Sequence, residues 1–234
     1  MPIARVRNKI LHFIHIPKTG GSYVTSYLRA IGQVALHSRT PVSCANTTPQ
    51  HMDIATSKIL LPLGFVDHRF AVIRDPLDRI LSEFRYRFTR AAQPEQSANA
   101  HKPENAVLLE LDWGQTFFGT FEEWVDLVFE MYQADPTVCD NHIRPQSDFV
   151  DAETKLFRFE NGIDTVLDWI DSTTGTLRRP FCIDQNESQR LQVNIPNHTR
   201  DKIIDFYRSD YRIINRLVEA NPAVAALGEQ RVDG

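Results

Sequence analysis

Residues 9–28, KILHFIHIPKTGGSYVTSYL, carry the strongest structural signal in this chain. The apolar run at residues 10–16 predicts a short buried strand of a parallel sheet. Pro17 has no backbone N–H to donate, so the strand ends there. A short loop follows at once, and the apolar residues after it, beginning with Tyr23, fall at helical spacing. The stretch therefore predicts a strand, a loop of phosphate-binding size and a helix.

The loop Lys18-Thr19-Gly20-Gly21-Ser22 contains the groups that an anion needs. Two glycines let the backbone bend tightly and bring N–H groups close to a ligand, while one lysine and two hydroxyls add charge and donors. The pattern differs from the P-loop GxxxxGK[ST], because Lys18 precedes both glycines. A smaller anion than a nucleoside triphosphate therefore suits the loop better. A plain Gly-Gly turn between a strand and a helix is the alternative.

A second strand and helix are predicted around Arg74. Residues 68–73, HRFAVI, form the strand, Asp75 is a good N-cap, and Pro76 suits the first helical position. Ser82 lies eight residues after Arg74, about two turns into the helix. Both side chains can face the groove above the carboxyl ends of the strands, where open α/β sheets bind ligands. The alternatives are a surface arginine paired with a nearby carboxylate and an ordinary helical serine.

Together PKTGGS (17–22) and RDPLDRILSEFRY (74–86) resemble the sulfotransferases that use 3′-phosphoadenosine-5′-phosphosulfate (PAPS). The resemblance is closest to the carbohydrate branch related to heparan and chondroitin sulfotransferases. Weaker matches follow in the expected order: NHIRPQ at 141–146, FEN at 159–161, NES at 186–188 and DY at 210–211. The first two motifs are specific as a pair, and the later ones would mean little without them.

The resemblance implies a donor-binding role for nine residues. The 5′-phosphosulfate would be held by Lys18, Thr19, Gly20, Gly21 and Ser22. Arg74 and Ser82 would hold the 3′-phosphate, the arginine through a bidentate fork. Asn186 and Ser188 would belong to a loop that covers the adenine end. Lys18 would also stabilise the charge that develops on the leaving phosphate oxygen.

The resemblance also implies a catalytic histidine that takes the proton from the acceptor hydroxyl. We favour His51, because it follows a loop that leaves a short strand predicted at 33–36 and should return to the same sheet edge as the phosphosulfate loop. The unperturbed pKa of histidine lies near neutrality, which suits a general base. His37 and His142 are competing candidates, and a surface histidine at a helix start is the structural alternative.

The segment 140–149, DNHIRPQSDF, is dense in polar groups and has no strong periodicity. In the resembled family this segment lines the active site. We therefore predict that Arg144 and Gln146 contact the acceptor or the sulfate, with His142 as a possible catalytic group. A loop that crosses the sheet, with His142 held by local hydrogen bonds, is the alternative.

The element order predicts a single three-layer α/β domain over residues 1–234 with a mostly parallel central sheet. Residues 1–9 are expected to be a weakly structured lead-in, and 89–115 a flexible loop. Thr120 and Glu123 form a capping box for a helix. One long final helix is expected from Thr199, followed by a frayed tail at 222–234.

Composition narrows the function classes. The 234 residues suffice for one domain, and 42% hydrophobic with 24% charged residues is ordinary for a globular protein. The net charge of −4 gives no positive electrostatic field that would attract nucleic acid.

The sequence has three scattered cysteines, which form neither a disulfide framework nor a metal-binding pair: Cys44, Cys139 and Cys182. No apolar run reaches the ~18–20 residues of a membrane span, and no signal peptide is visible. A cytoplasmic location is therefore expected.

The sequence thus predicts a PAPS-dependent O-sulfotransferase that needs no metal. Its acceptor is expected to be a hydroxyl group, with a carbohydrate or glycoconjugate as the favoured class. Two other classes stay open. A small-molecule kinase or NTPase would depend on ATP and magnesium and would need an acid at a strand end; Asp75 has that place but is better explained as an N-cap. A non-catalytic nucleotide-binding module would bind the same nucleotide without turnover.

Overall fold

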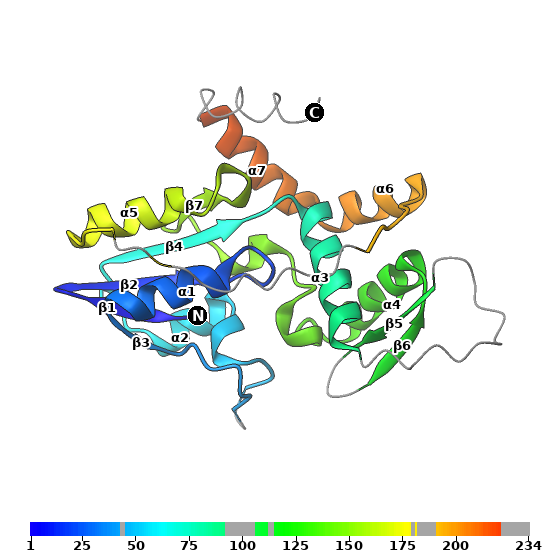
Figure 1. Ribbon diagram of the computed structural model, residues 1–234, viewed down its shortest axis with the longest axis horizontal. Coiled ribbons are helices and arrows are strands. Elements are labelled where there is room, and N and C mark those ends of the chain that lie inside the picture. Colours follow the sequence, from blue (N-terminus) through cyan, green and yellow to red (C-terminus); the bar gives the residue numbers. More distant parts are fainter. Residues whose placement is uncertain (43–44, 92–105, 112–114, 179–180, 182–190, 221–234) are drawn as a thin grey trace.

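The computed structural model describes residues 1–42, 45–91, 106–111, 115–178, 181 and 191–220. Its central sheet has five strands in the order β3-β1-β2-β4-β7 (Figure 1). The strands are β1 (Ile3–Val6), β2 (Lys9–Ile14), β3 (Gln33–Ala35), β4 (His68–Ile73) and β7 (Lys155–Arg158). The β2, β4 and β7 strands run parallel, whereas β1 pairs antiparallel with both of its neighbours.

The prediction of a mostly parallel sheet is confirmed only in part: β2, β4 and β7 form the parallel part, but the sheet is mixed because β1 is antiparallel to both of its neighbours. The prediction of a weakly structured lead-in at 1–9 is wrong, because β1 lies within it. Two residues, Arg7 and Asn8, join β1 to β2, and so short a connection can only form an antiparallel hairpin. In β1 the buried Ala4 and Val6 alternate with the exposed Arg5, which is the period-2 pattern of an amphipathic strand.

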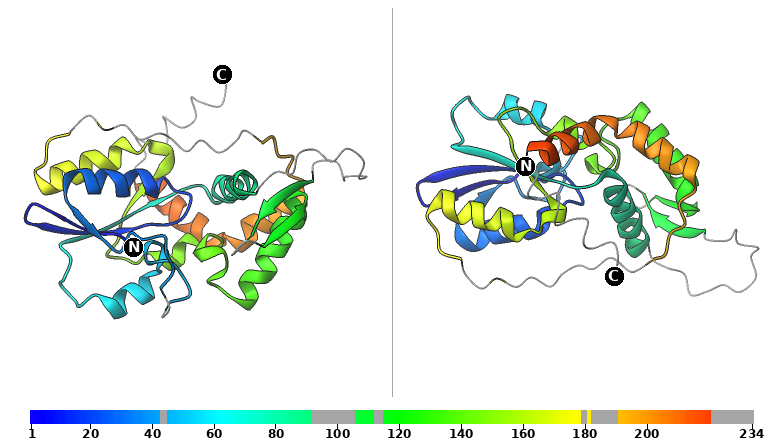
Figure 2. Two further views of the ribbon diagram at one scale, coloured as in Figure 1. Left: turned by 60° about the horizontal axis from the view of Figure 1, so that its bottom comes forward. Right: turned by 90° about the horizontal axis from the view of Figure 1, so that it is seen from above.

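Helices cover both faces of the sheet. On one face lie α1 (Gly21–Ile31) and α5 (Asp164–Thr174), which share an apolar cluster with β1, β2 and β4. On the other face lie α2 (Ile54–Leu60) and α7 (Arg208–Ala220), which pack on a smaller cluster around Ile73. The right view of Figure 2 shows the sheet edge-on between these two layers. The three-layer arrangement is as predicted for this part of the chain.

The two strand–helix units predicted from the sequence are present. The first leads from β2 through the glycine loop into α1, and the second leads from β4 into α3 (Pro76–Arg90). Asp75 caps α3, because its Oδ1 accepts hydrogen bonds from the N–H groups of Leu77 and Asp78 at 2.9 and 3.0 Å. Since β2 and β4 are parallel neighbours, their carboxyl ends meet at one edge of the sheet.

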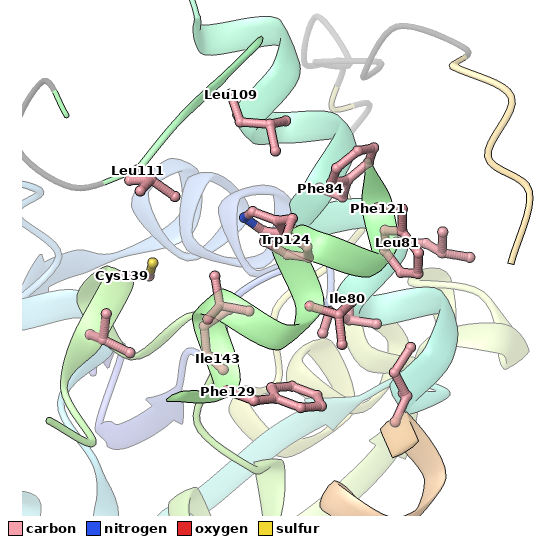
Figure 3. Close-up of a cluster of buried hydrophobic side chains, with 14 of the residues drawn as sticks. Ile80, Leu81, Phe84, Leu109, Leu111, Phe121, Trp124, Phe129, Cys139 and Ile143 are labelled. Atoms are coloured by element: carbon pink, nitrogen blue, oxygen red, sulfur yellow. The ribbon is translucent and has the colours of Figure 1, made fainter. Parts of the chain in front are cut away.

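A third apolar cluster lies beside the sheet and includes Ile80, Leu81 and Phe84 of α3; Figure 1 shows this helix at the side of the sheet. It also contains residues from α4 (Phe121–Ala134), α6 (Asn197–Phe206) and a two-stranded sheet of β5 (Val107–Glu110) and β6 (Thr116–Gly119). Figure 3 shows Trp124 of α4 in the middle of this cluster, and its ring centroid lies 5.3 Å from that of Phe84 on α3. The predicted capping box of Thr120 and Glu123 is present at the start of α4.

Two further boundaries differ from the predictions. The predicted loop at 89–115 begins inside α3 and includes β5; residues 92–105 and 112–114 lie outside the described chain. The predicted single final helix is two helices, because the backbone leaves helical geometry at Tyr207. The buried Tyr207 hydroxyl donates to the Ile143 carbonyl at 2.8 Å. The tail at 222–234 is also outside the described residues.

Short 3₁₀ turns complete the connections at Pro49–His51, Gln146–Phe149 and Phe159–Asn161, and a turn with left-handed backbone lies at Val138–Asn141. Among the helices that the structure describes, none is both long enough and apolar enough to span a membrane.

Candidate active site

The loop between β2 and α1 presents backbone donors at the carboxyl edge of the sheet. Gly20 has a φ of 82° and precedes the first residue of α1, which has no capping side chain. The first N–H groups of α1 are thus left for a ligand or for water. Thr19 is fully buried, and its hydroxyl donates to the Ile16 carbonyl at 2.9 Å. Ser22 is exposed beside them and accepts a hydrogen bond from Arg39 at 3.0 Å.

Gly21 is required by a close neighbour. A Cβ atom at this position would lie 2.1 Å from Cδ2 of His15, which is far inside contact distance. The His15 ring is buried, and its Nδ1 has no hydrogen-bond partner among the described residues. The imidazole therefore packs directly beneath the start of α1 and supports the loop from below.

We expect Gly21→Ala to destabilise the protein by about 1–3 kcal/mol, the usual cost of overpacking. An alanine inside an unobstructed helix would instead stabilise by about 1 kcal/mol relative to glycine, so the sign of the change is informative. Denaturant unfolding of Gly21→Ala, His15→Ala and the double variant would measure it. If the ring is the obstacle, Gly21→Ala should cost much less in the His15→Ala background. Equal costs in both backgrounds would rule out the contact as the cause.

Lys18 and Arg74 bring the two predicted anion-binding segments into contact. The Arg74 Nη1 donates to the Lys18 carbonyl at 3.3 Å, and the guanidinium lies 4.6 Å from the centroid of the Phe159 ring. The Lys18 Nζ lies 4.1 Å from the centroid of the Tyr86 ring on α3. Burial lowers the pKa of Lys18, while the carboxylate of Glu83 opposes this shift. Both cations are half-buried at the same edge of the sheet.

Gln146 holds the backbone of Arg74. Its Oε1 accepts from the Arg74 N–H at 2.9 Å, and its Nε2 donates to the Arg74 carbonyl at 2.8 Å. The side chain is 1% exposed, so both ends of the amide are used inside the protein. The structure therefore gives Gln146 a positioning contact with Arg74, and the predicted contact with substrate stays a prediction.

The other predicted donor-site residues are placed only in part. Ser82 is half-buried on α3, one position before the buried Glu83. Asn186 and Ser188 lie outside the described residues. Their predicted contacts with the nucleotide therefore stay predictions.

Three histidine rings meet beside the loop. The ring of His51 contacts that of His15 edge-on, with centroids 5.0 Å apart, and that of His142 in the same way at 4.9 Å. Two of these rings are also held by carboxylates. Nδ1 of His51 lies 2.7 Å from Oδ2 of Asp140, and Nδ1 of His142 lies 2.7 Å from Oε2 of Glu83. His37, the third candidate from the sequence, has no ring contact with this cluster among the described residues.

Sequence reasoning missed the two carboxylates, Asp140 and Glu83, because each acts at long range. Asp140 is 89 positions from His51, and Glu83 is 59 positions from His142. No local spacing indicates either pairing. The sequence analysis also did not identify His15 as part of the site, because it lies in an apolar run that predicts only a strand.

The surroundings of His51 keep its imidazole neutral. Burial lowers the pKa of His51 to about 4, and the hydrogen bond to Asp140 opposes the shift without overcoming it. Because an ionised carboxylate only accepts hydrogen bonds, the proton of the neutral ring lies on Nδ1. Nε2 then carries a lone pair, as a general base requires.

Glu83 is the most deeply buried acid of the site. It is 1% exposed and pairs with Arg87 at 2.6 Å as well as with His142. Burial raises the pKa of this carboxyl, but its interactions with His142 and with the Arg87 guanidinium outweigh burial, and the net shift is downward. Glu83 therefore stays ionised between its partners.

Arg144 is held by two acids. It forms ion pairs with Asp53 and, at 3.6 Å, with Asp148, and it donates to the side-chain oxygen of Asn141 at 3.3 Å. Its predicted contact with the acceptor stays a prediction.

His51, Asp140 and His142 have ligand-type atoms within 4.8 Å of one another. Hydrogen bonds already occupy both Asp140 oxygens, since the Thr48 N–H donates to Oδ1 at 2.6 Å and the Thr48 hydroxyl to Oδ2 at 2.7 Å. Both oxygens of this carboxylate are thus satisfied within the protein. The expectation that the reaction needs no metal is untested and would be checked by assaying activity after chelation.

Comparisons with known proteins bear on these motifs. The model of the sulfotransferase family matches residues 3–215, a range that contains the glycine loop, Arg74, Ser82 and the histidine cluster. No curated protein and no solved structure matches the chain. The family match covers nearly the whole sequence, and the chain therefore belongs to the sulfotransferase family.

Proposed function

We propose that this sulfotransferase uses PAPS as its donor and transfers the sulfuryl group to a hydroxyl of a carbohydrate. The observation that carries the proposal is the hydrogen bond from Arg74 to the Lys18 carbonyl. It joins the loop after β2 to the segment after β4, so the two predicted anion-binding segments lie next to each other. PAPS carries phosphates at both ends of its ribose and matches such a pair of sites.

The residues present fit this nucleotide. The uncapped start of α1, the positive φ of Gly20 and the half-buried Lys18 suit the phosphosulfate end. Arg74 and Ser82 suit the 3′-phosphate, because the guanidinium is held in place by the Phe159 ring and by the Lys18 carbonyl, while Gln146 fixes the Arg74 backbone. A fixed guanidinium loses little freedom when it binds an anion.

When bound, PAPS supplies the sulfuryl group that moves to the acceptor. The protein's part is positioning and charge stabilisation, as in phosphoryl transfer. Lys18 places a positive charge beside the loop, where the leaving phosphate oxygen gains negative charge. His51 offers an unprotonated Nε2 to the acceptor hydroxyl. His142 is the second candidate base, because its ring contacts that of His51 and its Nδ1 is likewise held by a carboxylate.

The acceptor class rests on the resemblance of the two motifs to carbohydrate sulfotransferases. The net charge of −4 offers no sign of a long site for a polyanion. A neutral or weakly charged sugar is therefore the first acceptor to test. The cytoplasmic location and the single-domain organisation also remain predictions.

The kinase alternative is disfavoured by the use of Asp75. A magnesium site would need a free acid at the end of β4, whereas Oδ1 of Asp75 accepts from two N–H groups of α3. A non-catalytic module is disfavoured by the position of His51, because its Nδ1 lies 2.7 Å from Oδ2 of Asp140, an arrangement that suits a general base and that nucleotide binding alone does not require.

A thermal-shift titration tests the donor. Adenosine-3′,5′-bisphosphate should raise the melting temperature of the wild type, because a ligand that binds only the native state stabilises it. Arg74→Ala should weaken this binding by roughly 10- to 150-fold, the equivalent of about 1.5–3 kcal/mol for a hydrogen bond to a charged group. The matched control is Arg69→Ala, at the opposite end of the same strand, where the guanidinium pairs with Asp151 at 3.2 Å.

Stabilisation by ATP and magnesium, and not by the bisphosphate, would reject the PAPS assignment. Equal bisphosphate affinity in wild type and Arg74→Ala would remove Arg74 from the 3′-phosphate site. A PAPS-dependent assay on a panel of sugars and phenols would then test the acceptor class, and labelling of phenols alone would reject the carbohydrate.

A further inference from the structure

We propose that Asp140 is a positioning residue, which fixes the orientation and tautomer of the His51 ring so that Nε2 is presented to the acceptor hydroxyl. The inference deepens the proposed function and rests on it. Neither Asp140 nor its pairing with His51 follows from the motifs that identify the family.

The first support is the hydrogen bonding around the Asp140 carboxylate. Oδ2 lies 2.7 Å from Nδ1 of His51, and Thr48 donates to Oδ1 through its N–H and to Oδ2 through its hydroxyl. The two hydrogen bonds from Thr48 thus hold the Asp140 carboxylate in place independently of its contact with the His51 ring. Since it can only accept, the proton of the neutral ring must lie on Nδ1. The second nitrogen, Nε2, is left with its lone pair.

The second support is a separate contact from the next residue. Nδ2 of the buried Asn141 donates to the His51 carbonyl at 2.8 Å. Adjacent side chains of one turn therefore hold both the ring and the backbone of His51. A histidine held at two points loses little freedom on reaching the reactive geometry.

The third support is the backbone of that turn. Cys139, Asp140 and Asn141 have φ values of 57°, 55° and 63°, so three consecutive non-glycine residues adopt the left-handed conformation. This conformation is unfavourable for residues with a Cβ and persists only where the surrounding structure imposes it; such positions cluster at functional sites. Here the turn directs two successive side chains to the same histidine.

These contacts fit the following proton and sulfuryl transfer. The acceptor O–H bond breaks and its proton passes to Nε2 of His51, while the acceptor oxygen bonds to sulfur. The bond between sulfur and the leaving phosphate oxygen breaks, and its electron pair stays on that oxygen beside Lys18. Nδ1 keeps its proton, Asp140 stays ionised, and its charge stabilises the imidazolium that forms. The arrangement follows the logic of the carboxylate in a serine-protease triad.

The test is Asp140→Asn. Asparagine has the same shape and tolerates the left-handed backbone, so the turn should survive. Its amide can donate to Nδ1, which then becomes the acceptor and leaves the proton on Nε2. We expect kcat to fall by about 10²- to 10⁴-fold, by analogy with the same change in a catalytic triad. Acceptor KM and the Kd for adenosine-3′,5′-bisphosphate should stay within about twofold, because a positioning role acts on the chemical step.

A spectroscopic readout separates this role from a structural one. In ¹⁵N-labelled protein, the His51 ring should carry its proton on Nδ1 in the wild type and on Nε2 in Asp140→Asn. His51→Ala provides the assignment and the lower limit for kcat. The control is Asp126→Asn, an exposed acid on α4 that pairs with Lys202 and should change neither tautomer nor kcat.

Two outcomes would overturn the proposal. One is a kcat in Asp140→Asn within about threefold of wild type. The other is a wild-type His51 protonated on Nε2, and this measurement needs neither turnover nor a folded variant. If the expected tautomer were found in a protein that does not use PAPS, the proposed function would fail while the positioning contact held.

Discussion

Replacing Lys18 with alanine should cut kcat for sulfuryl transfer at least a hundredfold while the protein stays folded. The ammonium group lies over the Tyr86 ring and at the loop where the leaving oxygen gains charge. Removing one preorganised donor from such a position usually costs about 10²–10³ in rate. The backbone should tolerate the change, since alanine at the positive φ of 67° is no more strained than lysine.

The measurement is the rate at saturating PAPS and acceptor, so that lost binding is not mistaken for lost chemistry. Lys9→Ala is the matched control, because Lys9 is the first residue of β2, at the far end of the strand from the Lys18 loop, and pairs there with Asp67 at 3.7 Å. Lys18→Arg adds a second comparison, since it keeps the charge but changes its shape. A Lys18→Ala rate within about threefold of wild type, under ~0.7 kcal/mol in barrier, would show that Lys18 has no catalytic role.

Glu83→Ala should be the most destabilising single change at the site, at about 3–5 kcal/mol. The buried carboxylate bonds both His142 and Arg87, so its loss leaves two donors in the interior without the charge that stabilised them. A loss of this size is a large share of the about 5–15 kcal/mol that stabilises a typical domain. The control is Glu153→Ala: this glutamate pairs with Arg69 at 3.4 Å, but its side chain is 74% exposed, so under ~1 kcal/mol is expected.

The same residue predicts a pH dependence. The pKa of Glu83 is lower in the folded protein than in the unfolded chain, where a glutamate titrates at about 4.3. Its contribution to stability is therefore complete above that pH and is lost as pH falls through the folded-state pKa. Urea unfolding between neutral pH and pH 3 should show a steeper loss in wild type than in the variant. Glu83→Gln serves if the alanine variant does not fold, and parallel pH profiles would contradict the prediction.

The parts of the fold that could be predicted are those with a local cause. The loop after β2, the Asp75 cap and the Thr120 capping box each depend on residues within a few positions, and each is present. No proline or glycine in the sequence predicts the break between α6 and α7. It coincides instead with the burial of Tyr207 against Ile143, a contact that only the folded chain brings about.

The candidate site divides in the same way. Lys18 and Arg74 lie in recognisable motifs, and the structure places them in contact. The partners that tune the histidines come from distant segments, and their identity depends on how α3 and the 138–141 turn pack beside the loop. Spacing along the chain carries no information about such pairs. For Gln146, sequence reasoning identified the segment but could not indicate that its amide would hold a backbone.

The two outer strands of the central sheet are short, and this limits edge-to-edge association of the protein at high concentration. The sheet ends in β3, with three residues, and β7, with four, and the latter carries Lys155 and Arg158. A strand edge exposes unpaired N–H and C=O groups that can recruit another chain, and short or positively charged edges limit this. The two outer strands thus offer little template for edge-to-edge association, so the parallel strands that carry the site are shielded from aggregation on both sides.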